Sequence, residues 1–221
     1  MHPSKQNIKV AVDNCIFTVK EGKLHIILIQ MKREPFTSQW AIPGGLVNHA
    51  ESLDSAAKRV LHEETGVSDV YLEQLCTFGE PKRDPIGHVI STAYFALIPS
   101  DSAILKTNKK YLDVAWVAVS DVPRLAYDHN AIVKYAKQRL QWKLEYTNVV
   151  WSLLSKYFTL SEMQAVYEAI LDRKLDKRNF QKKILGLCLI EKTEKTSMKG
   201  AHRPAVLYKF ISQKPKIVNI L

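Results

Sequence analysis

The segment from Gly45 to Val67 constrains the fold more than any other part of the chain. Ser52 is a suitable N-cap residue and Gly66 suits the turn that ends a helix, so a helix is predicted over 53–65. Charged residues recur at fixed offsets along the segment: Glu51, Arg59, Glu63 and Glu64. Because residues three and four apart share one face of a helix, we expect acidic side chains on one face.

This spacing resembles the Nudix box, G-x5-E-x7-R-E-U-x-E-E-x-G-U, in which U is a bulky aliphatic residue. Nudix hydrolases cut a nucleoside diphosphate linked to another group, and the resemblance implies a site for Mg²⁺ held by carboxylates. Every fixed position matches except one, because Val60 stands where the family has the first glutamate of its core. Glu51, Glu63 and Glu64 are the candidate metal ligands that remain, as a residual site.

Two interpretations of Val60 stay open. In one, hydrolysis continues with the remaining carboxylates at reduced metal affinity. In the other, catalysis is lost while the ligand pocket persists. Val60 extends an apolar stripe that includes Leu53, Ala57 and Leu61, so it also suits the core. The second interpretation is favoured: we assign no catalytic residue and expect no required cofactor, with Mg²⁺ bound only if the residual site is retained.

Four residues are candidate ligand-binding residues: Arg33, Gly45, Arg83 and Asp84. The two arginines lie in loops next to predicted strands, where a guanidinium can form paired hydrogen bonds with phosphate or ribose oxygens. The stretch from Phe78-Gly79 through Arg83-Asp84-Pro85 to Gly87 resembles the ADP-ribose branch of the Nudix family. That resemblance favours a ligand role over that of solvated loop charges.

Strands and helices are mixed along the first two thirds of the chain. Apolar runs rich in β-branched residues predict strands at 8–19, 24–31, 40–43, 71–79, 88–98 and 113–119, and a second helix is predicted at 128–142. This order predicts an α/β fold, which the resemblance identifies as a Nudix α/β/α sandwich. The polar stretch 141–148 marks a boundary, so we predict a ligand-binding domain over 1–145 and a second domain over 146–221.

The second domain carries most of the positive charge. Residues 151–221 hold 14 Lys+Arg against 6 Asp+Glu, whereas residues 1–150 hold 18 against 16. Such an asymmetry suggests a module that binds a polyanion. From charge alone, a merely soluble basic surface is an equal alternative.

The pattern of elements in this basic region predicts a winged helix-turn-helix. One helix is expected over 160–171, a second over 176–185, and strands at 187–192 and 205–211 flank a basic loop. The second helix has an apolar side, and its outer face suits DNA contacts: Lys177, Arg178, Gln181 and Lys182. Lys199 and Arg203 in the loop are candidate phosphate contacts.

The two halves together are similar to the Nudix-related transcription regulators (NrtR-like and AraR-like), bacterial repressors and activators of NAD-metabolism and sugar-utilisation genes. The resemblance covers nearly the whole chain, including Trp40–Gly45, the box, Lys177–Phe180 and Arg203–Phe210. It implies a degenerate Nudix domain that senses ADP-ribose or a sugar or sugar phosphate. It also implies a homodimer whose winged helices bind a palindromic double-stranded operator.

Two other functions remain as alternatives. One is an active Mg²⁺-dependent hydrolase of the ADP-ribose pyrophosphatase type with an accessory domain, against which Val60 argues. The other is an RNA-binding adaptor without sequence preference. No apolar run is long enough to span a membrane, and three widely spaced cysteines fit buried free thiols, so we expect a cytoplasmic protein with no membrane partner.

Overall fold

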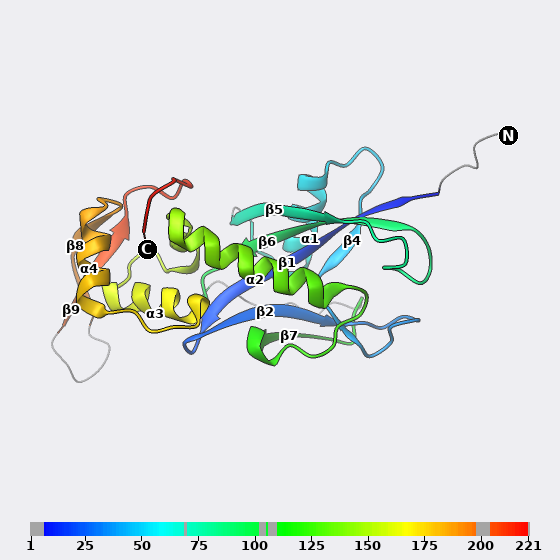
Figure 1. The fold of residues 1–221 in the computed structure, drawn as a ribbon, viewed down its shortest axis with the longest axis horizontal. Coiled ribbons are helices and arrows are strands. Elements are labelled where there is room, and N and C mark those ends of the chain that lie inside the picture. Colours follow the sequence, from blue (N-terminus) through cyan, green and yellow to red (C-terminus); the bar gives the residue numbers. More distant parts are fainter. Residues whose placement is uncertain (1–6, 69, 102–104, 106–109, 198–203, 221) are drawn as a thin grey trace.

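The computed structural model describes residues 7–68, 70–101, 105, 110–197 and 204–220. Its largest element is a seven-stranded mixed sheet in the order β3-β2-β1-β6-β5, with β4 paired to β1 and β7 paired to β2 (Figure 1). The strands are β1 (Lys9–Lys20), β2 (Lys23–Gln30), β3 (Trp40–Ala41), β4 (Gly44–Leu46), β5 (Tyr71–Phe78), β6 (Val89–Leu97) and β7 (Asp113–Ala118). β1 and β6 run parallel, and the other pairs are antiparallel.

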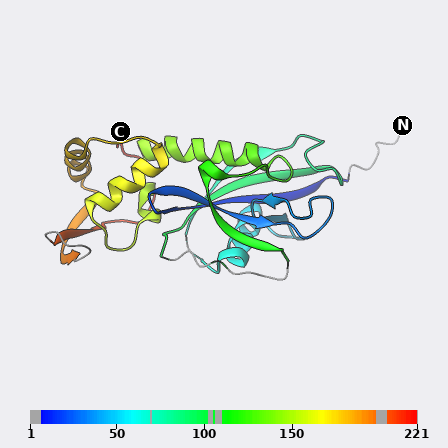
Figure 2. The same ribbon diagram turned by 90° about the horizontal axis from the view of Figure 1, so that it is seen from below.

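Helices α1 (Leu53–Thr65) and α2 (His129–Tyr146) cover opposite faces of this sheet, as Figure 2 shows. Side chains of β1 alternate between the two faces. Cys15 and Phe17 belong to the core under α2, and Ile16 belongs to the core on the other face. Because both faces are covered, β1 is buried continuously from Ala11 to Thr18. The predicted α/β/α sandwich is confirmed.

The ends of α1 are those that the sequence predicts. The Ser52 side chain accepts a hydrogen bond from the Ser55 amide, and Gly66 adopts a left-handed conformation with φ 68°. Elsewhere the bounds differ. β4 and the short 3-10 helices η1 (Val119–Asp121) and η2 (Val149–Leu153) were not predicted, and α2 continues to Tyr146. Most of the polar stretch 141–148 is therefore helical, and the boundary predicted at 145/146 falls at the end of α2.

The C-terminal part forms the predicted winged helix from α3 (Leu160–Leu171), α4 (Lys177–Gly186), β8 (Ile190–Ser197) and β9 (Ala205–Phe210). Thr159 and Glu162 form a capping box at the start of α3, and Asp176 caps α4. Tyr167 of α3 and Phe180 of α4 are in edge-to-face contact at 5.2 Å between ring centroids. The predicted first strand of the wing starts later than expected, at Ile190.

The two parts share one continuous hydrophobic core. A single cluster of buried side chains extends from Cys15 and Phe95 of the sheet to Phe158, Tyr167 and Phe180 of the winged helix. Figure 1 shows α3 beside the end of α2. The winged helix is therefore packed directly against the Nudix-like sheet and α2, and not joined to it by a linker alone.

The C-terminal segment returns from β9 to the end of α2. The amides of Val218 and Ile220 donate to the carbonyl oxygens of Tyr146 and Glu145, both at 2.9 Å. The Asn148 side chain accepts from the Lys216 amide at 2.7 Å and donates to the Lys214 carbonyl at 3.1 Å. The bonds from Val218 and Ile220 satisfy carbonyl groups that the end of a helix leaves without partners.

The cysteines differ from the expectation that all are buried. Cys15 is buried, Cys76 is partly buried, and Cys188 is exposed in a left-handed conformation with φ 52°. Apolar neighbours misled the prediction for Cys188, because it lies in the turn after α4, where the chain reverses.

Among the described residues, no helix is long and apolar enough to cross a membrane.

We predict that burial of Ile220 is what stabilises the C-terminal segment. Ile220 is 2% exposed, so Ile220→Ala should lower the free energy of unfolding by roughly 2–5 kcal/mol, the usual cost of removing a buried aliphatic side chain. Ile217→Ala is the matched control: Ile217 is 82% exposed, and its loss should change stability by less than about 0.5 kcal/mol. Urea denaturation measures both, and equal losses would contradict the assignment.

Candidate functional site

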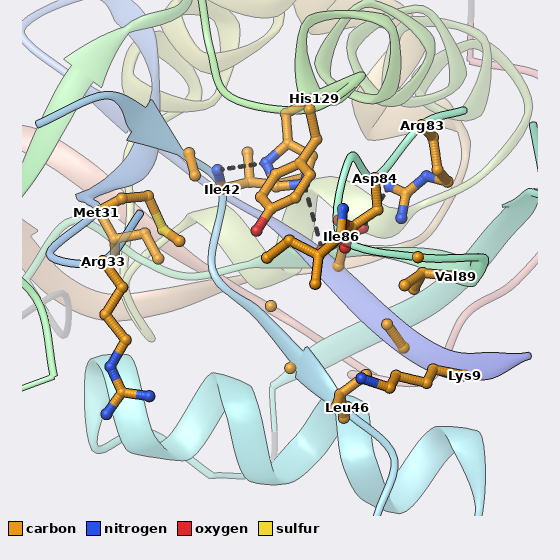
Figure 3. Close-up of a pocket in the computed structure, with 18 of the residues that line it drawn as sticks. Lys9, Met31, Arg33, Ile42, Leu46, Arg83, Asp84, Ile86, Val89 and His129 are labelled. Carbon is orange, nitrogen blue, oxygen red and sulfur yellow. Dashed lines mark hydrogen bonds and ion pairs between the residues drawn. The ribbon is translucent and has the colours of Figure 1, made fainter. Parts of the chain in front are cut away.

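A cavity of about 510 Å³ opens at the end of the sheet where β1, β2 and β4 meet the loop before β6. Residues from β1, β4, the loop after β2, the loop between β5 and β6, and the start of α2 line it (Figure 3). Its size lies in the usual range for a small-molecule site. All four predicted ligand-binding residues, Arg33, Gly45, Arg83 and Asp84, line this cavity.

Arg83 is held in the wall of the cavity by two carboxylates. Its Nε and Nη2 atoms donate to Asp128 at 2.9 and 2.6 Å, and Nη2 also donates to Asp13 at 3.1 Å. Burial opposes the guanidinium charge, but the hydrogen bonds with Asp128 and the charge of Asp13 raise the pKa of Arg83 overall. The Arg83 side chain is only 4% exposed. Since Asp13 lies on β1 and Asp128 precedes α2, this buried ion pair joins β1 to the start of α2.

Asp13 is also the partner of two other buried groups. The Ser91 hydroxyl donates to it at 2.6 Å, and His129 Nε2 lies 3.5 Å from its Oδ1 atom. His129 Nδ1 accepts from the Ile42 amide at 3.1 Å, which places the ring proton on Nε2, facing Asp13. Burial lowers the pKa of His129, so the ring is neutral at pH 7 and orients Asp13 without adding charge.

The other predicted ligand residues have different surroundings. Arg33 is exposed at the rim and lies on the opposite side of the cavity from Arg83 in Figure 3. Asp84 accepts from the Ile86 amide at 2.8 Å and so orders its own loop. A Cβ atom on Gly44 would lie 2.2 Å from Asp13, so this strand approaches the buried network closely only because it has glycine there. Direct ligand contacts by these residues remain predictions.

An aromatic side chain of the cavity, that of Tyr127, was missed by the sequence analysis. Phe36 and Tyr127 contact each other at 4.3 Å between ring centroids, and Tyr127 lies 5.0 Å from the His129 ring. Tyr127 has φ 54°, a conformation that bulky residues seldom adopt. The sequence analysis also missed polar residues that lie far apart in the chain but line the cavity: Lys9, Asp13, Lys110, Tyr111 and His129.

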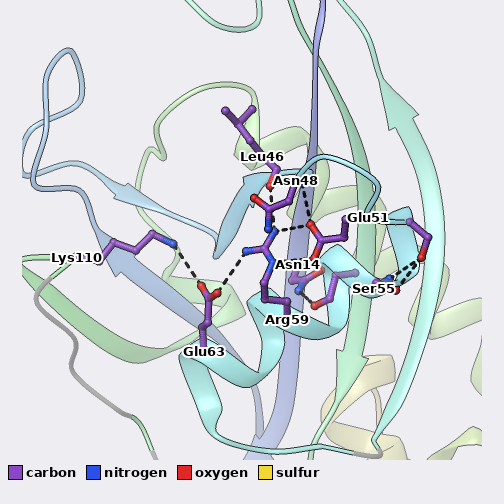
Figure 4. A network of polar contacts seen from close by, with 10 residues as sticks. Asn14, Leu46, Asn48, Glu51, Ser55, Arg59, Glu63 and Lys110 are labelled. Atoms are coloured by element: carbon purple, nitrogen blue, oxygen red, sulfur yellow. Dashed lines mark hydrogen bonds and ion pairs between the residues drawn. The ribbon is translucent and has the colours of Figure 1, made fainter.

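The acidic residues of the Nudix box are held by basic side chains. Arg59 forms paired hydrogen bonds with Glu51, at 2.8 and 2.9 Å, and also donates to Glu63 at 3.3 Å (Figure 4). Hydrogen bonds from Arg59 and the Asn48 amide lower the pKa of Glu51 to about 2. Lys110 approaches the other oxygen of Glu63 at 3.7 Å. Glu51 and Glu63 thus each lie beside cationic side chains.

The third predicted ligand, Glu64, lies apart from these two. It is fully buried, and its carboxylate lies beside the phenol of Tyr111, whose pKa is raised by burial and by the Glu64 charge. Val60 is also fully buried and packs with Val12, Ala56 and Tyr94. The described residues contain no group of three or more acidic, histidine or cysteine side chains placed to hold a metal ion. As arranged, the residual carboxylates do not fit a Mg²⁺ site.

The winged helix presents the second candidate site, on α4. Phe180 and Ile184 are buried, whereas Lys177, Arg178 and Lys182 are exposed and Gln181 is half-buried. This distribution agrees with a helix that packs by one face and presents the other to a ligand. Lys199 and Arg203, the predicted contacts of the wing, lie outside the described residues.

Comparison with known proteins matches both parts of the chain. Residues 8–138 match the NUDIX domain model, and residues 150–210 match the model of the NrtR DNA-binding winged helix domain. An ADPR responsive transcriptional repressor, NtrR, of Acinetobacter baylyi is 38% identical over 92% of this chain and 82% of its own length. An ADP-ribose pyrophosphatase of Methanocaldococcus jannaschii is 34% identical over 65% of this chain and 76% of its own length.

Solved structures of Shewanella oneidensis NrtR are also similar. The NrtR complex with a 27mer DNA has a TM-score of 0.81 at 31% identity, covering 91% of this chain and 93% of that one. The NUDIX domain of the same protein in complex with ADP ribose has a TM-score of 0.54 at 34% identity, covering 59% of this chain and 87% of that one. The Nudix fold, the winged helix and their order along the chain agree throughout, and the chain belongs to the NrtR family of Nudix-related transcriptional regulators.

Proposed function

We propose that the chain is a transcriptional repressor that responds to ADP-ribose, bound in the Nudix cavity, and binds an operator through the winged helix. The observation that carries this proposal is that a Nudix helix with Val60 in place of a box glutamate and a helix with an exposed basic face belong to one packed unit. Val60 is buried in the position of a catalytic glutamate, while α4 exposes its basic face. The Acinetobacter repressor and the DNA complex of the Shewanella protein support it.

The cavity suits a nucleoside diphosphate sugar. The ring of Tyr127, against which Phe36 packs, offers a surface on which a base can stack, and the basic side chains of Lys9, Arg33 and Lys110 can compensate phosphate charge. The ADP ribose complex of the Shewanella NUDIX domain supports ADP-ribose over a sugar or sugar phosphate. We propose that this binding needs no cofactor, because Glu51 and Glu63 already have cationic partners.

Operator binding is proposed to involve a homodimer. A single winged helix presents one recognition helix, and two such helices related by a two-fold axis read a palindrome. In this proposal α4 of each protomer enters a major groove through Lys177, Arg178, Gln181 and Lys182. The protein then acts in the cytoplasm, where the operator is.

The route from ligand to operator is proposed to run along α2. His129, the first residue of α2, accepts from the Ile42 amide, and Asp128 just before it accepts from Arg83. Both contacts form part of the cavity wall. The other end of α2 is bonded to the C-terminal segment, and Gln141 of α2 donates to the Ile170 carbonyl of α3 at 2.9 Å. A ligand that favours one position of α2 therefore changes the preferred position of the winged helix.

We predict that the purified chain binds ADP-ribose without hydrolysing it. With Mg²⁺ present, chromatographic assays for AMP and ribose 5-phosphate should detect no turnover at an ordinary enzymatic rate, because Val60 supplies no carboxylate and Glu64 is buried. Glu64→Gln serves as the control, since it would abolish any genuine metal-dependent hydrolysis. Turnover by the native chain that disappears in this variant would establish the hydrolase alternative instead.

We also predict that DNA binding depends on the exposed basic face of α4. The operator is first selected from random duplexes with the native chain. Arg178→Ala and Lys182→Ala should then weaken binding, and Lys182→Ala should reduce the slope of log affinity against log salt by about 1, as expected for one lost phosphate contact. Lys134→Ala, an exposed lysine of α2, is the control. If affinity follows salt but no sequence is selected, the chain is a non-specific nucleic-acid binder.

A further inference from the structure

The charged side chains beside α1 form a row of alternating sign that includes Lys110. Glu51 is bound by Arg59, Arg59 also binds Glu63, and Lys110 lies 3.7 Å from the second oxygen of Glu63 (Figure 4). In the row Glu51–Arg59–Glu63–Lys110, each carboxylate therefore has a cationic neighbour. Lys110 is the member of this row that lines the cavity.

The position of Lys110 is fixed by the next residue in the chain. The Tyr111 side chain packs against the core cluster that includes Leu61 and Ile29, and its phenol lies beside the buried Glu64 carboxylate. Lys110 keeps about half of its side chain exposed, at 49%. Its ammonium group can therefore move a few ångströms toward the cavity while its backbone stays anchored.

A diphosphate in this cavity needs positive charge close to its oxygens. A Nudix hydrolase supplies that charge with divalent cations held by the acidic helix face. In this chain the cavity wall on the α2 side cannot supply it, because the charge of Arg83 is already offset by Asp13 and Asp128. On the α1 side, Lys110 brings a permanent positive charge to the edge of the same acidic face.

We propose that Lys110 binds the diphosphate of the ligand and replaces the metal ion of a hydrolase in this role. The proposal rests on the function proposed above and specifies how that site recognises its ligand. Glu63 positions the ammonium group when the cavity is empty, and phosphate oxygens compete for it when the ligand enters. Recognition of the diphosphate is then independent of divalent cations.

The test compares the native chain with Lys110→Ala and Lys110→Arg by isothermal titration calorimetry, in EDTA and in Mg²⁺. ADP-ribose, adenosine and inorganic pyrophosphate are the probes. Native binding of ADP-ribose should be equal in the two buffers. Lys110→Ala should weaken ADP-ribose and pyrophosphate binding roughly tenfold to a hundredfold, as expected for one charge-assisted hydrogen bond, and leave adenosine binding unchanged. Lys110→Arg should retain most of the affinity.

Lys58→Ala is the control, because Lys58 is an exposed lysine on α1 that lies outside the cavity lining. Unchanged ADP-ribose affinity in Lys110→Ala, or native binding that EDTA abolishes, would overturn the role of Lys110. If the native chain binds pyrophosphate through Lys110 but does not bind ADP-ribose, the proposed ligand is wrong while the role of Lys110 stands. If the native chain binds neither ADP-ribose nor pyrophosphate, both proposals fail.

Discussion

The buried ion pair between Arg83, Asp13 and Asp128 is the interaction on which the arrangement of this molecule depends. Removing a charge from water is costly unless its partners are close and well oriented. Arg83 lies in the loop before β6, Asp13 on β1 and Asp128 at the start of α2. The ion pair therefore forms only when these three parts of the chain come together. The same contacts form one wall of the cavity. The geometry of the ligand site is thus set by the folding of the sheet and α2.

From this ion pair, α2 extends to the winged helix without a flexible segment. Its last turn is bonded to the returning C-terminal chain, and the core under it continues into α3 and α4. A well-packed core responds to strain by moving whole elements, since side chains leave few voids to absorb the change. The cavity wall and the base of α4 consequently belong to one packed unit, on which the proposed coupling between ligand and operator rests.

Local signals in the sequence were sufficient for most of the fold. The caps Ser52, Gly66 and Asp176 act through their nearest neighbours, so their positions could be read directly from the chain. The site was only half predictable. Asp13 and His129 lie at distant points of the sequence and gain their role only when the sheet places them together. The buried Glu64 carboxylate lies beside Tyr111, which comes from a segment that no helical pattern connects with the box.

The structure also explains what the retained residues of the Nudix box do in the fold. Gly66 ends α1 in a left-handed conformation, and Arg59 connects the start of this helix to β4 through Glu51 and the Leu46 carbonyl. The Glu51 carboxylate in turn accepts from the Asn48 amide and closes the loop before α1. Each of these box residues has a structural partner within the protein, so the box shapes the cavity even where Val60 has removed a carboxylate. The shape of the cavity therefore does not depend on a carboxylate at position 60.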